Sequence, residues 1–274
     1  MISPVMWCPR IETALERPNL FLMRQIILPP PPVDPDAEIE RLARRYRAAG
    51  GLGIQVLNTL GTRADSLLDR LPAGVRGQLD TATKAALSQA MSAASRSRRI
   101  VPDQAEWLNT AVSTAMGAAG GFGGLPTALA ELPVTTTLLL RVIEGVAVEH
   151  GFDPAAESVR FDCVQVFASA GPLEHDDGSD LAFLSARVAL TGSAMQAIIA
   201  RVAPRLGVVL GQKLAAQTVP VLGAVAGAAT NYAYTSYYTD IAHVHFGLRR
   251  LSVETDQAHA RLVERLRAEV KALR

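Results

Sequence analysis

Apolar residues recur at three- and four-residue spacing along most of the chain, which is the pattern of helices that bury one face. Asp34 before Pro35 predicts a helix start, because aspartate caps helix N-termini and proline fits the first helical position. The acids of segment 36–49 come first and its arginines last, which suits the helix dipole. Further helices are expected over 57–71, 75–91, 135–150, 153–170, 181–202, 204–218 and 253–274.

Two long windows, 107–130 and 214–239, carry no charged residue and are rich in Ala and Gly. The glycines of 117–124 allow either close backbone approach or a mobile loop, and Gly223 with Gly227 has the spacing of a tight helix crossing. Each window is long enough for a bilayer, but strongly apolar residues are few. We therefore expect both windows to be buried within a bundle, with an interfacial hairpin or a true membrane span as alternatives.

The predicted fold class is all-α, a single multi-helix bundle with the two Ala/Gly-rich apolar helical regions at its core. Residues 1–33, which include four consecutive prolines, are expected to form an irregular N-terminal arm. The helical domain is expected over 34–251. Residues 252–274 are predicted to form a C-terminal amphipathic helix, and its apolar stripe consists of Leu262, Leu266, Val270 and Leu273.

Composition narrows the function classes. The 274 residues carry 27 Lys+Arg against 26 Asp+Glu, and 49% are hydrophobic. These values argue against global disorder and against nucleic-acid binding, which would require a cationic surplus. Two cysteines are too few for a disulfide framework, and Cys163 lies within an apolar stretch that suits a buried thiol. No secretory signal precedes the predicted helices, so cytoplasmic residence is expected.

Polar residues inside the apolar helices are the candidates for a site. Thr137, Arg141 and Glu144 share one helix face, and buried charges require partners. The group fits a network that fixes helix register, a ligand-binding cleft or, third, a catalytic site. The full candidate set for this polar cleft or network is Thr137, Arg141, Glu144, Arg160, Lys213, Asn231, Asp240 and His245.

A metal site is not predicted. Asp240 and His243 share a helix face, but His243 and His245 lie about 200° apart around a helix, so the three side chains do not converge. His150 and His259 are expected at helix ends or in solvent. The glycine-rich segment lacks the Gly-Lys-Ser/Thr of a phosphate-binding loop, and no Gly-x-Ser-x-Gly or His-Glu-x-x-His motif occurs. Neither a cofactor nor catalytic residues are predicted.

Several motifs together resemble the EcsC protein family, over roughly residues 40–251. The most specific are "LPVTTTLLLR" at 132–141 and "VPVLGA" at 219–224, followed by Asn231 and by the His245–Leu251 segment. The other matching stretches are 120–126, 151–154, 160–163 and 166–168. The resemblance implies a helical protein without established catalytic residues or cofactor. The family is named after the third product of an operon that encodes an ABC transporter.

The expected function is that of a non-enzymatic, cytoplasmic helical protein peripheral to the inner face of the membrane. Its expected partners are a lipid surface or a membrane protein of the ABC-transporter kind, with homo-oligomerisation through the C-terminal helix as a further option. The alternative is an enzyme, or a binder of an apolar small molecule, that uses the polar cleft among the central helices.

Overall fold

The computed structural model describes residues 33–49, 51, 89–90, 93–94, 96, 106–122, 124–167, 184 and 223–273. Within these residues the chain is helical and contains no strand, which confirms the all-α prediction. The six helices are α2 (Pro35–Ala48), α6 (Glu106–Phe122), α7 (Gly124–Glu149), α8 (Glu157–Phe167), α10 (Gly223–Thr255) and α11 (His259–Ala272).

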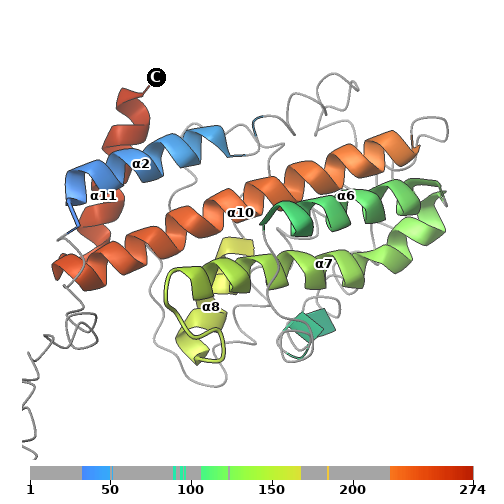
Figure 1. Ribbon diagram of the computed structural model, residues 1–274, viewed down its shortest axis with the longest axis horizontal. Helices are drawn as coiled ribbons and strands as arrows, with labels where there is room; N and C mark the ends of the chain where they lie inside the picture. The colour runs from blue at the N-terminus through green and yellow to red at the C-terminus, as the bar shows by residue number, and fades with distance from the viewer. Residues whose placement is uncertain are drawn as a thin grey trace, which may run out of the picture. The chain divides into compact units, whose positions relative to one another are not determined.

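Helix α10 is the axis around which the other five pack. It has 33 residues and contacts α2, α6, α7, α8 and α11 (Figure 1). Helix α6 runs antiparallel along it, because Glu106 at the start of α6 meets His243 while Gly117 meets Gly227. The second contact joins the two uncharged windows, so parts of both lie at the core of the bundle as predicted.

Glycine makes the α6–α10 crossing possible. A methyl group on Gly117 would lie 2.7 Å from Asn231 Nδ2 and closer still to the carbonyl oxygen of Gly227, and neither separation is sterically allowed. Asn231 Nδ2 donates to the carbonyl of Ser113 at 2.8 Å, and Thr235 donates to the Ser113 hydroxyl at 2.7 Å. The close approach therefore brings buried polar groups within bonding distance of each other.

The remaining core lies where α2, α8 and α11 meet α10 and α7. The tyrosines at 234, 237 and 238 are buried there as ordinary core residues. Helix α2 has the predicted Asp34 cap, whose carboxylate accepts the Asp36 amide at 2.9 Å. Helix α11 packs against α2 through the predicted apolar stripe, of which Leu262, Leu266 and Val270 are buried and Leu273 is 37% exposed.

Three helix boundaries differ from the sequence-based expectation. Helix α7 begins at Gly124 and continues through Pro133, whereas the helix predicted from the sequence began at Thr135. A proline removes only one backbone donor, so the surrounding packing can keep the helix continuous. Helix α8 begins at Glu157, because the Asp153 carboxylate accepts the Ala155 amide at 2.8 Å and holds a turn before it.

The third difference concerns the C-terminus. Helix α10 extends to Thr255, and α11 starts only at His259. Asp256 has a φ of 52°, the left-handed conformation that ends a helix. Val253 therefore belongs to α10 rather than to the C-terminal helix. The predicted stop after α7 is confirmed, since Gly151 has a φ of 83°.

None of the helices in the described part of the chain combines the length and the apolar character needed to cross a membrane. Several expected segments lie outside the described residues, apart from Val33 and Leu184: the N-terminal arm, the helices over 57–71, 181–202 and 204–218, and most of the helix over 75–91. Lys213 also lies outside them.

Candidate functional site

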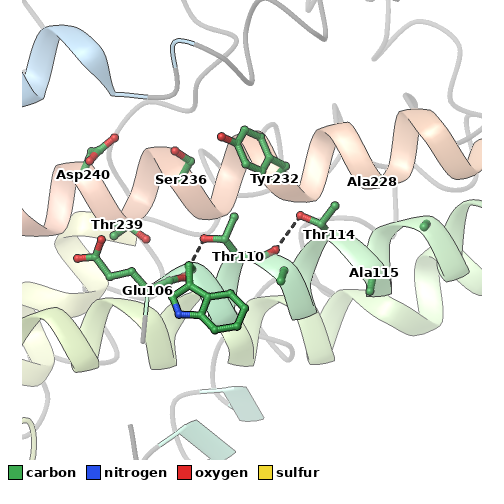
Figure 2. Close-up of a pocket in the computed structure, with 12 residues that line it drawn as sticks. Glu106, Thr110, Thr114, Ala115, Ala228, Tyr232, Ser236, Thr239 and Asp240 are labelled. Carbon is green, nitrogen blue, oxygen red and sulfur yellow. Dashed lines mark hydrogen bonds between the residues drawn. The ribbon is translucent and has the colours of Figure 1, made fainter. Parts of the chain in front are cut away.

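A surface groove of about 700 Å³ runs between α6 and α10. Figure 2 shows Ala228, Tyr232, Ser236 and Asp240 along the α10 wall, opposite the wall formed by α6. The residues that line the groove are Glu106, Trp107, Thr110, Ala111, Thr114, Ala115, Ala118, Ala228, Tyr232, Ser236, Thr239 and Asp240. Alanines supply much of the apolar lining, and the carboxylates lie together at one end.

The threonines of the α6 wall bond to their own helix. Thr110 donates to the Glu106 carbonyl at 3.0 Å, and Thr114 donates to the Thr110 carbonyl at 2.7 Å (Figure 2). A hydroxyl that donates in this way offers a ligand only its oxygen as an acceptor. The α6 wall is therefore mostly apolar, apart from Glu106 at the start of the helix.

A compact polar cluster occupies the charged end of the groove. His243 Nε2 bonds to Glu106 Oε1, and Arg45 of α2 lies 2.9 Å from Asp240 and 3.6 Å from Glu106. The hydrogen bond with His243 lowers the pKa of Glu106 and outweighs the opposing effect of its burial, so Glu106 is ionised at neutral pH. Burial raises the pKa of Asp240, although Arg45 opposes this.

The last residue of α7 and the residue that follows it add two side chains behind this cluster. His150 Nε2 lies 3.0 Å from His243 Nδ1, and Glu149 Oε2 lies 3.8 Å from His243 Nε2. Burial, and then the neighbouring His243, lower the pKa of His150 to about 4. His150 is therefore neutral at physiological pH and can either donate or accept the bond with His243. Side chains from the start of α6 and from the end of α7 thus converge on His243, and Arg45 of α2 borders them through Glu106 and Asp240.

The opposite side of α10 carries a second polar group. Asp162 of α8 bonds to Arg249 and lies 3.4 Å from His245 Nε2. Burial favours the neutral form of Asp162, but His245 and Arg249 together outweigh it, and the pKa of Asp162 is lowered. Arg249 also lies over the Phe152 ring, 4.6 Å from its centroid. This group joins α8 to α10 and does not reach the groove.

The residues predicted for one polar cleft are distributed over several places. Glu144 is buried and Arg160 is exposed, whereas Asn231 bonds across the α6–α10 crossing. Among the candidates that the structure describes, Asp240 alone lines the main groove, and His245 lies on the far side of α10.

Thr137 and Arg141 line a second groove of about 570 Å³, which is mainly apolar. Its lining also includes Leu108, Val112 and Met116 of α6, and Pro133, Val134 and Leu138 of α7. The Thr137 hydroxyl donates to the carbonyl of Pro133 at 2.7 Å. The shared helix face of Thr137 and Arg141 therefore has a physical counterpart, but Glu144 does not lie in that groove.

Sequence reasoning missed the centre of the cluster. Glu106, Glu149 and His150 were not candidates, and His150 and His259 were expected at helix ends or in solvent. His150 and His259 do lie at helix ends, since His150 follows the last residue of α7 and His259 begins α11. Neither lies in open solvent, because His150 packs on His243 and His259 is 9% exposed with its Nε2 2.9 Å from the carbonyl of Leu184. The opposite placement of His243 and His245 around α10 was predicted correctly. Glu106 begins α6 and Glu149 ends α7. Their closeness to His243 could not be predicted without knowing that α6 packs antiparallel to α10.

Fold and site together define an all-α protein in which a long central helix forms one wall of a groove, with two carboxyl groups at one end of that groove. The EcsC protein family model matches residues 79–251, well over half of the chain, and this protein belongs to that family. No curated protein and no solved structure matches it.

Proposed function

We propose that the protein binds an amphipathic small molecule in the α6–α10 groove. The observation that carries this proposal is the lining: alanines along both helices, with the ionised Glu106 and the carboxyl group of Asp240 at one end. Ligand sites are mostly apolar and contain a few polar groups that orient the ligand, and about 700 Å³ is within their usual range. The apolar part of the ligand lies along the alanines and its head group reaches Glu106.

Charge specifies the head group. Glu106 and Asp240 supply two carboxylates at that end of the groove, and Arg45 is the cation that contacts both. A cationic or hydrogen-bond-donating head therefore gains more than an anionic one. We expect a single-chain amine or quaternary ammonium compound to bind more tightly than a carboxylate or sulfate of the same chain length.

The fluorescence of Trp107 can report ligand binding, since this residue lines the groove and is 71% exposed. The other tryptophan, Trp7, can be replaced by phenylalanine so that fluorescence reports on Trp107 alone. Titration with decyltrimethylammonium below its micelle concentration should give a saturable blue shift, and decyl sulfate should bind more weakly. A linear, unsaturable response to both compounds would disprove groove binding.

A matched pair of variants tests where the compound binds. Ala115 lines the groove, whereas Ala119, one turn further along α6, does not line either groove described, and both are exposed. Ala115→Leu should weaken binding at least about tenfold, because the larger side chain occupies part of the groove. Ala119→Leu should leave it unchanged. Equal effects of the two substitutions would place the compound elsewhere.

A second candidate function, contact with a lipid surface, is favoured by a different observation. Trp107, Val112 and Val134 are 71%, 44% and 51% exposed, and no charge occurs in 107–130. Exposed apolar side chains of this kind suit the boundary between headgroups and acyl chains. We propose that these exposed side chains let the protein act at the periphery of the inner face of the membrane, beside a lipid or membrane-protein partner.

Liposome flotation tests that contact. The full-length chain should rise with phosphatidylcholine or phosphatidylglycerol vesicles, and a Trp107→Ser/Val112→Ser double variant should remain at the bottom of the gradient. Recovery of the unaltered chain at the bottom with both vesicle types would exclude direct lipid contact as the function.

A further inference from the structure

We propose that Glu106, Glu149 and His243 form a binding site for one divalent transition-metal ion, of which Zn²⁺ is the best fit. Each residue offers one ligand atom, and the three atoms lie within 4.8 Å of one another. The ligands come from three helices, since Glu106 begins α6, Glu149 ends α7 and His243 lies in the middle of α10. This site is separate from the groove function, although it shares Glu106 with it.

The cluster is built around a buried histidine. His243 is 7% exposed, and its Nε2 faces both carboxylates: it bonds to Glu106 and lies 3.8 Å from Glu149. Its other nitrogen lies 3.0 Å from His150, which fixes the ring orientation. Histidines that bind metals are held in the same way by a partner on the second ring nitrogen.

For a neutral His243 ring, the hydrogen-bonding pattern allows two positions of the ring proton. In one, His150 donates to His243 Nδ1, and the proton on His243 Nε2 points at Glu106. In the other, His243 donates from Nδ1 to His150, and the bare Nε2 lone pair faces two carboxylates. The second arrangement is repulsive unless a cation lies among the three atoms. A metal ion supplies that cation and stabilises this tautomer.

A small, partly open space lies next to the proposed ligands. A cavity of about 10 Å³ is lined by Glu106 and Glu149 together with Asn109, Arg141, Val142, Gly145 and Val146. That volume is at the lower limit for one water-sized body. Arg141 and Arg45 lie beside the carboxylates, and their positive charges partly compensate the negative charge of the site. We therefore expect selective binding of one small dication rather than a general affinity for cations.

The ligand types specify the metal. One imidazole and two carboxylates favour zinc and its first-row neighbours, whereas magnesium and calcium prefer all-oxygen sites. Three protein ligands leave a coordination position open, as in zinc sites that bind water or an exchangeable ligand. Because Glu106 also lines the groove, that position is adjacent to the charged end of the groove.

The test is metal binding by the untagged full-length chain after dialysis against a chelator. Calorimetry with ZnCl₂ should give one ion per chain. Binding of CoCl₂ should produce visible absorption bands typical of cobalt that is coordinated by a nitrogen atom. MgCl₂ and CaCl₂ should bind far more weakly. Glu149→Gln and Glu106→Gln should each weaken Zn²⁺ binding at least about tenfold, because loss even of an outer partner costs 10- to 100-fold.

Glu40→Gln is the matched control, since Glu40 pairs with Arg44 on the surface of α2. The side chains of Glu106 and Glu149 are 45% and 52% exposed, so both variants should fold, which circular dichroism can verify. Zn²⁺ binding that is absent, or equal in the unaltered chain and both site variants, would overturn the proposal. Ala115→Leu should leave Zn²⁺ binding intact and Glu149→Gln should leave the groove intact, so the two proposals fail separately.

Discussion

His243 and His245 lie two residues apart on α10 and face opposite regions of the protein. The His243 region contains Glu106, Glu149 and His150, and it adjoins the groove. The His245 region contains Asp162 and is closed between α8 and α10. Both histidines are at least nine-tenths buried and both face carboxylates. The regions differ in their partners, because Asp162 is 15% exposed whereas Glu106 and Glu149 are about half exposed.

This difference separates a structural role from a binding role. Asp162 is held by an arginine as well as by a histidine, and the arginine is itself held over Phe152. Such a group stabilises one arrangement of helices, and neither of the grooves between the described helices is lined by it. The carboxylates around His243 are accessible, and Glu149 has only a distant contact with the ring. The proposed binding role of His243 and the structural role of His245 thus follow from the side chains that face each ring.

The largest effect is expected from a substitution that disrupts the His243 region and leaves the His245 region intact. Gly117→Ala should destabilise the protein by about 3 kcal/mol, because the added methyl would overlap the Gly227 backbone and displace α6 from α10. Gly145→Ala is the matched control: nothing lies within 4 Å of its added methyl, so it should stabilise the helix by about 0.5–1 kcal/mol. Urea unfolding of both variants measures the difference, and equal stabilities would contradict the close crossing.

The second prediction tests the closed region. Asp162→Asn should destabilise the protein by about 3 kcal/mol, since it leaves Arg249 and His245 without their shared carboxylate in a mostly buried site. Urea unfolding monitored by circular dichroism gives the value. The matching substitution at a surface pair, Glu254→Gln beside Arg250, should change stability by less than about 0.5 kcal/mol. A similar loss in both variants would remove the distinction between buried and exposed carboxylates.

Much of the fold could be predicted from the sequence because it depends on local signals. Asp34 and Pro35 start α2 as expected, and Gly151 ends the turn after α7. The Gly227 spacing indicated a close crossing, which the contact with Gly117 confirms. Pro133 misled the prediction because a local helix-breaking preference lost to the packing of a long helix.

The site was harder to predict because its parts are far apart in the chain. His243 Nε2 meets Glu106 across 137 residues, and nothing in the spacing of either helix indicates the other. Acidic residues are also common in the first turn of helices, because they interact favourably with the helix dipole. Nothing at Glu106 in the sequence therefore indicated a binding site. Asp240 was a candidate because it shares a face with His243, but its contact with Arg45 depends on the packing of α2.

The third prediction concerns acid. Because the pKa of Asp162 is lowered in the folded protein, its contribution to stability is complete above the unfolded value of about 3.8 and is lost as the pH falls through the lower folded value. The unfolding free energy of the unaltered chain should therefore fall more steeply below about pH 5 than that of Asp162→Asn. Urea titrations at successive pH values measure both slopes. Parallel slopes would show that Asp162 is not the residue responsible.

The smallest expected effect is also the sharpest test of the comparison. In metal-free buffer, Glu149→Gln should change the unfolding free energy by less than about 0.5 kcal/mol, because this side chain is 52% exposed and lies 3.8 Å from the His243 ring. Calorimetric melting should accordingly superimpose on that of the unaltered chain. If Glu149→Gln instead costs as much as Asp162→Asn, then the carboxylates around His243 hold the helices together just as Asp162 does. The functional contrast between the two sides of α10 would then be lost, whatever either side binds.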